Sequence, residues 1–202
     1  MKVKSWKKRK RWPDRRDVRL QDLHWSRFAA VVPYYKDNGR TASIVYYRDG
    51  SRDFTDARCE RVLEELAVYW KLTLDGLQRR SEQLCQNKNR RRMPLVLTEN
   101  ISLIPLKCRE ENYRNTGTLG YWMKSSMYHV QILPDGTTLI LLYKEHKGIA
   151  IPQRWETVMQ QIKLCEQLED CYKSQMRLRR ICHNAAEYGE WPGHSDDTGY
   201  EP

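Results

Sequence analysis

The chain has 202 residues, of which 40% are hydrophobic and 31% are charged, and its formal net charge at pH 7 is +10. This length and composition suit one folded domain with appendages and exclude a chain that is disordered throughout. The sequence contains no run of roughly 18–20 apolar residues and no apolar segment after its basic start, so neither a membrane span nor a signal peptide is predicted. We expect a cytoplasmic protein.

The charge is unevenly distributed along the chain. Residues 1–19 contain ten Lys or Arg against two Asp, whereas residues 183–202 contain five acidic residues and no Lys or Arg. This asymmetry points first to nucleic acid as a partner and second to an anionic membrane surface. The six cysteines have no C-x-x-C spacing, so neither a metal site nor a disulfide framework is predicted, and no cofactor is expected.

Residues 1–26 are polar, lack periodicity and are interrupted by Pro13, which predicts a basic arm that is disordered when free. Its cations can neutralise phosphates, and an arginine can enter the narrow minor groove of A·T-rich DNA, while Trp6 and Trp12 stack. The alternatives are a solvated terminus without a specific partner and contact with a membrane surface. The candidate DNA-binding residues of the arm are Lys7, Lys8, Arg9, Lys10, Arg11, Arg15 and Arg16.

An α+β domain is predicted over residues 27–151. The run Phe28 to Tyr35 predicts a strand, and "TASIVYY" with the turn "RDGS" continues it as a hairpin or meander, because Asn-Gly and Asp-Gly supply the positive φ angles of tight turns. Apolar residues then recur at three- and four-residue steps in "FTDARCERVLEELAVYWKL", which predicts a helix. A shorter helix is predicted in "TLDGLQRRSEQLCQ". These two helices are an insertion between predicted strands.

A second basic cluster follows the second helix. Between residues 79 and 92 the chain has six cations and one acidic residue, Glu82. Because the cluster lies between a predicted helix and a predicted strand, we expect a loop on a rigid scaffold, which suits contacts to phosphates. The alternative is an ordinary solvated linker. The candidate DNA-binding residues of this cluster are Arg79, Arg80, Lys88, Arg90, Arg91 and Arg92.

The middle of the chain is predicted to be mostly antiparallel β. "PLVL", "ISLIPL" and "GYWM" predict short strands, and "YHVQIL" and "TTLILLY" predict a hairpin around Pro-Asp-Gly. Residues 152–188 predict one long helix whose apolar stripe either packs on the sheet or contacts another subunit. Residues 189–202 predict an acidic disordered tail. The stripe residues are Trp155, Val158, Met159, Ile162, Cys165, Leu168, Tyr172 and Met176.

Over residues 28–150 this order of elements resembles the ComK family of bacterial competence transcription factors. The resemblance implies a cytoplasmic activator that binds A·T-rich double-stranded DNA largely through the minor groove and acts as an oligomer. The basic arm, the segment "KCREENYRNTGTL" and the long helix with its acidic tail depart from the family pattern. The residues that carry the resemblance are Pro94, Leu95, Val96, Ile101, Leu103, Pro105, Gly120, Tyr121, Trp122, His129, Val130, Asp135 and Gly136.

Catalysis is not predicted. The five histidines are scattered, and the chain contains no H-E-x-x-H, G-x-S-x-G or G-x-x-x-x-G-K-[ST] motif. The catalytic alternative is a nuclease that holds a divalent cation with Asp49, Asp53 or Glu64, but Asp49 belongs to an Asp-Gly turn and Glu64 lies on the solvent side of its helix.

The sequence therefore predicts a sequence-preferring, double-stranded DNA-binding regulator of transcription, most simply an activator. We expect it to form a homo-oligomer through the C-terminal helix and to bind neither a metal nor a membrane. The alternative from another class is a non-enzymatic interaction or inhibitor module, of viral origin for example, whose basic surface mimics or binds nucleic acid. RNA binding is the third interpretation, although no RNP1-like motif is present.

Overall fold

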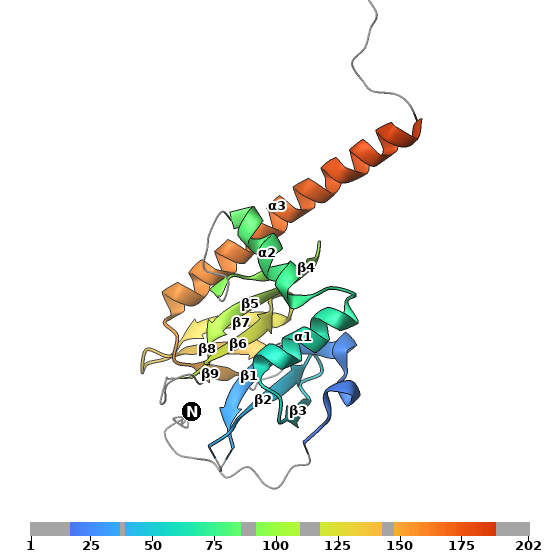
Figure 1. The fold of residues 1–202 in the computed structure, drawn as a ribbon. Helices are drawn as coiled ribbons and strands as arrows, with labels where there is room; N and C mark the ends of the chain where they lie inside the picture. The colour runs from blue at the N-terminus through green and yellow to red at the C-terminus, as the bar shows by residue number, and fades with distance from the viewer. Residues whose placement is uncertain (1–16, 37–38, 86–91, 110–117, 143–147, 189–202) are drawn as a thin grey trace, which may run out of the picture.

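The computed structural model describes residues 17–36, 39–85, 92–109, 118–142 and 148–188 (Figure 1). The described residues form an α+β fold, as predicted. The helices are α1 (Cys59–Tyr69), α2 (Leu74–Cys85) and α3 (Trp155–Tyr188). The strands are β1 (Phe28–Tyr35), β2 (Thr41–Tyr47), β3 (Arg52–Thr55), β4 (Leu95–Thr98), β5 (Ile101–Lys107), β6 (Leu119–Met123), β7 (Met127–Ile132), β8 (Thr138–Leu142) and β9 (Ile149–Ile151).

Two antiparallel sheets contain these strands. One sheet has the order β3-β2-β1-β6-β5-β4 and the other the order β7-β8-β9. Gly39 and Gly50, in the turns after β1 and β2, have φ angles of 78° and 80°, which explains why the turn sequences contain glycine. The join between β1 and β6 brings together segments about 90 residues apart, and it closes the two hairpin regions into one sheet.

The six-stranded sheet is buried on both faces because its central strands alternate between two cores. In β1, Val31 faces the first core whereas Ala30 and Val32 face the second, and in β5 Leu103 and Ile104 divide in the same way. The sequences of strands that are buried on both faces are continuous apolar runs, without alternation of polar and apolar residues. This burial makes the sheet the rigid centre of the molecule.

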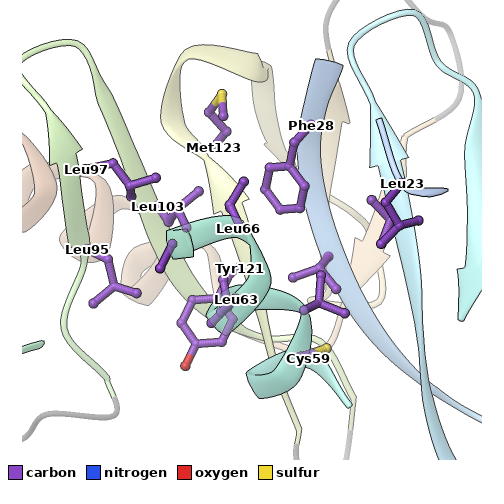
Figure 2. Close-up of a cluster of buried hydrophobic side chains, with 14 of the residues drawn as sticks. Leu23, Phe28, Cys59, Leu63, Leu66, Leu95, Leu97, Leu103, Tyr121 and Met123 are labelled. Atoms are coloured by element: carbon purple, nitrogen blue, oxygen red, sulfur yellow. The ribbon is translucent and has the colours of Figure 1, made fainter. Parts of the chain in front are cut away.

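The first core lies between the six-stranded sheet and the helices α1 and α2. Figure 2 shows Leu63 and Leu66 of α1 among Phe28, Leu103 and Tyr121 of the sheet. Leu66 is 1% exposed, and full burial of such a side chain contributes about 1.5–3 kcal/mol. The helical spacing of the apolar residues therefore gives α1 one apolar face, and the six-stranded sheet covers that face.

The predicted arm over residues 1–26 is wrong for residues 17–26, which pack on the first core. Leu23 is 5% exposed, the Val18 amide donates to the Phe54 carbonyl over 2.7 Å, and Trp25 lies against the core. Short 3-10 turns at Leu20–Asp22 and Trp25–Arg27 place these apolar side chains inward, although the segment shows no helical or strand periodicity. Residues 1–16 lie outside the described residues.

The second core lies between the other face of the six-stranded sheet, the three-stranded sheet and the first half of α3. Trp122, Ile140 and Val158 are each 0% exposed there. Gly120 allows the closest approach, because a Cβ at this position would lie 2.5 Å from the Cys108 sulfur and 2.8 Å from the Val31 carbonyl oxygen. A side chain at position 120 would therefore separate β1 from β6.

The first half of helix α3 has one buried face, whereas its second half is mostly exposed. Val158, Cys165 and Leu168 of the predicted stripe are buried within the chain, which is one of the two outcomes that the sequence left open. The C-terminal end of the helix extends beyond both sheets (Figure 1). In the described part of the chain, no helix has the length and apolarity to cross a membrane.

Candidate nucleic-acid interface

The described part of the second basic cluster lies where α2 meets β4 and α3. Ser81 donates its hydroxyl proton to the Pro94 carbonyl over 2.7 Å, and Arg80 Nη1 donates to the Val96 carbonyl over 3.3 Å. The Arg80 guanidinium also lies 5.0 Å from the centre of the Tyr172 ring, within the range of a cation–π contact. Arg80 therefore joins α2 to α3 and β4, a structural role that the sequence did not indicate.

Arg79 and Arg92 are the exposed members of this cluster among the described residues. Arg79 Nε lies 2.8 Å from an oxygen of Asp75 one helical turn earlier. An exposed pair of this kind contributes only about 0.3–0.5 kcal/mol, so the guanidinium can exchange the carboxylate for a phosphate. Lys88, Arg90 and Arg91 lie outside the described residues, as do Lys7, Lys8, Arg9, Lys10, Arg11, Arg15 and Arg16 of the arm.

Helix α2, which ends at Cys85 just before the basic segment 86–91, packs against β4 and α3. Burial raises the pKa of the Cys85 thiol, and the thiol of Cys171 on α3 raises it further. The chain is described again from Arg92, two residues before the Pro94 carbonyl that Ser81 binds. The described residues on either side of the basic segment therefore belong to the end of α2 and to the stretch just before β4.

A buried polar network fixes the first half of α3 to the sheets. Glu169 accepts hydrogen bonds from Lys124 Nζ over 2.8 Å and from the Ser102 hydroxyl, which in turn accepts from the Cys165 thiol over 3.1 Å. Burial lowers the pKa of Lys124, but the hydrogen bond and charge of Glu169 outweigh it, so the pKa lies above its ordinary value. With its buried groups paired, this network holds the axis of α3 in a defined direction.

The second half of α3 carries cations that the sequence analysis did not select. No Asp or Glu occurs between residues 171 and 186, whereas Lys173, Arg177, Arg179 and Arg180 all lie in that stretch. Arg180 Nη2 lies 2.5 Å from a Glu99 oxygen in the β4–β5 turn. Arg177 and Arg179 are exposed and pair with no carboxylate of the described chain. The signal for these residues in the sequence is a helical stretch that contains Lys and Arg but no Asp or Glu.

The carboxylates of the nuclease alternative lie in separate, ordinary contacts. Asp49 accepts from the Ser51 amide and hydroxyl in its turn, Asp53 accepts from the Tyr47 hydroxyl over 2.8 Å, and Glu64 pairs with an arginine three residues earlier. Within the described ranges, no three His, Cys, Asp or Glu side chains group as metal ligands would. Each of these carboxylates therefore has a local structural partner.

Comparison with family models, with curated proteins and with solved structures gave no match. The resemblance to the ComK family therefore stays a prediction from the sequence.

Proposed function

We propose that the protein is a sequence-preferring regulator of transcription that binds double-stranded DNA and activates at A·T-rich sites. The observation that carries this proposal is a set of exposed cations on the second half of α3, a helix whose first half is fixed to the sheets by the Glu169 network. Helix α2, which precedes the basic segment 86–91 in the chain, contacts the same helix through Arg80 and Tyr172. Cations on a rigid support suit the positioning of a phosphate backbone.

The arm has a complementary role in this proposal. Residues 1–16 supply nine Lys or Arg and one Asp, and such a segment gives affinity that depends on salt but reads little sequence. One arginine of the arm enters a narrow A·T minor groove, where the potential is most negative. The choice of duplex DNA over RNA rests on the ComK-like pattern and on the absence of an RNP1-like motif from the sequence.

The regulator acts without catalysing a reaction on the DNA and assembles through α3. Since Val158, Cys165 and Leu168 are buried within the chain, a second copy contacts the remaining apolar side chains of the first half of α3. Trp155, Met159 and Ile162 line a shallow groove on that surface. Sedimentation of Met159→Glu at micromolar concentration tests the contact: a dimer converted to a monomer supports it, and an unchanged dimer or a monomeric parent overturns it.

Gel-shift titrations of an A·T-rich duplex, a G·C-rich duplex and a structured RNA at one stated salt concentration test the function. We expect the A·T-rich duplex to bind with the lowest Kd and the RNA with the highest. Equal, weak binding to all three would support the interaction or inhibitor module instead, and preferential RNA binding would replace DNA as the partner.

A further inference from the structure

The second half of α3, defined here as residues 171–184, has two stripes on opposite sides. With about 100° of rotation per residue, Tyr172, Met176 and Arg180 follow the side that continues the buried stripe of the first half. Cys171, Leu178 and Cys182 lie on the other side, with Ile181 next to them. Leu178 is 62% exposed and Ile181 63% exposed, so this stripe faces solvent in the chain by itself.

Cations flank the solvent-facing stripe on both sides. On the same helical projection, Arg177 and Arg179 lie on opposite sides of the stripe, each roughly 100° from its mean direction. Arg180 faces away from the stripe, where its contact with Glu99 holds the helix against the β4–β5 turn. The stripe and the two flanking arginines therefore lie on the part of the helix surface that faces away from this contact.

A second copy of this chain fits the stripe poorly. Ser174 and Gln175 interrupt its apolar positions, and residues 171–186 contain no carboxylate that could pair with the arginines of a facing helix. Two such helices side by side would bring like charges together, which is destabilising. A membrane surface also fits poorly, since Leu178 and Ile181 are the large apolar side chains of the stripe and no Trp or Phe accompanies them. A polyanion is the occupant that the charge favours.

The dimensions fit the major groove of duplex DNA. An α-helix with its side chains is about 10–12 Å across, and the major groove of B-DNA is about 12 Å wide. Residues 171–184 span about 21 Å of helix at a rise of 1.5 Å per residue. In a groove, arginines on the two flanks of a helix reach the phosphates of the two strands, while an apolar stripe faces the base edges, where thymine presents a methyl group.

We propose that residues 171–184 of α3 lie in the major groove of A·T-rich duplex DNA, with Arg177 and Arg179 on opposite phosphate backbones and Leu178 and Ile181 against thymine methyl groups. This inference rests on the proposed function and adds a binding site to it.

Arg177→Gln/Arg179→Gln tests the phosphate contacts in the full-length chain. We expect the Kd for an A·T-rich duplex to rise roughly tenfold at about 150 mM salt, and the salt slope to fall by about 1.8, since each lost phosphate contact removes about 0.9. Arg58→Gln/Arg61→Gln, the same change in charge on exposed residues at the start of α1, is the control and should change both quantities little. Equal effects of the two double variants would overturn the assignment.

Replacing thymine by uracil in the duplex tests the groove, because it removes only methyl groups that lie in the major groove. We expect the parent protein to bind the uracil duplex several-fold more weakly than the thymine duplex. The variant Leu178→Ala/Ile181→Ala should bind the two duplexes equally. A uracil effect that is absent from the parent, or equal in both proteins, would overturn the major-groove placement.

The two proposals fail in different ways. A parent protein that binds no duplex overturns the proposed function and this inference together. A parent that binds duplex DNA with a steep salt slope, alongside an Arg177→Gln/Arg179→Gln variant with the same slope, overturns the inference alone. Vesicles of phosphatidylserine and phosphatidylcholine are the third probe: loss of vesicle binding in the variant, with duplex binding intact, would reassign the helix to a membrane surface.

Discussion

At the residue scale, Glu169 is a buried carboxylate that links α3 to the sheets. It is 9% exposed and joins α3 to Lys124 and Ser102. We expect Glu169→Ala to lower the free energy of unfolding by about 1–3 kcal/mol. This is less than for a fully buried pair, because Lys124 is partly exposed. Glu166→Ala is the control for urea unfolding. Its carboxylate is half-exposed and 3.4 Å from Lys124, so it should cost under about 1 kcal/mol. Equal losses would contradict this role of Glu169.

The cysteines give a second prediction at this scale. Burial raises the pKa values of Cys59, Cys108 and Cys165 to about 12, whereas Cys171 and Cys182 are exposed. At pH 8 we expect a thiol reagent to label Cys171 and Cys182 at once and the three buried thiols only on unfolding. Mass spectrometry of the labelled peptides checks the order. Early labelling of Cys165 would mean that α3 is not anchored.

The same thiols make stability depend on alkaline pH. Their pKa is 9.0 when unperturbed and about 12 in the folded chain, so above about pH 9 the unfolded state binds fewer protons than the folded state. The free energy of unfolding should therefore be independent of these groups below pH 8 and fall progressively from pH 9 to pH 12. Urea titrations across this range measure it, and a Cys165→Ala variant should show a shallower fall than the parent.

At the element scale, local patterns predicted the elements but not their neighbours. The strands β1 and β2 and the end of α3 agree with the predicted bounds, because alternation, glycine turns and helical period are local signals. The pairing of β1 with β6 depends on contacts between distant segments, which no local pattern contains. The packing of Leu23 and the cation–π contact of Arg80 escaped prediction for the same reason.

The two halves of α3 should respond differently to truncation. A chain that ends at Ser174 keeps Val158, Cys165 and Leu168 in place and loses mainly exposed side chains, so its thermal midpoint should fall by only a few degrees. Its affinity for duplex DNA should nevertheless drop at least as far as in the Arg177→Gln/Arg179→Gln variant. A chain that ends at Lys147 should not fold, because it lacks Ile151 and Val158 of the second core. Circular dichroism against temperature distinguishes these cases.

At the scale of the whole molecule, the charge of the arm is expected to supply affinity for DNA. The candidate residues of the arm lie outside the described residues, which begin at Asp17. Deleting residues 1–16 removes nine cations and one acid. We expect this deletion to lower the salt slope by several units and to change the order of preference among duplexes little. An unchanged slope would remove the arm from the interface.

The central claim is that the cations of the arm, of the basic cluster at residues 79–92 and of the second half of α3 bind the phosphates of duplex DNA. Fluorescence anisotropy of a labelled A·T-rich duplex, titrated with the full-length chain at several salt concentrations, measures it directly. If the cations of these three regions all contact phosphates, log Kd should rise linearly with log salt concentration. The slope should be about 4 or more, since each neutralised phosphate contributes about 0.9. A slope near zero, or no binding at low salt, would contradict the claim.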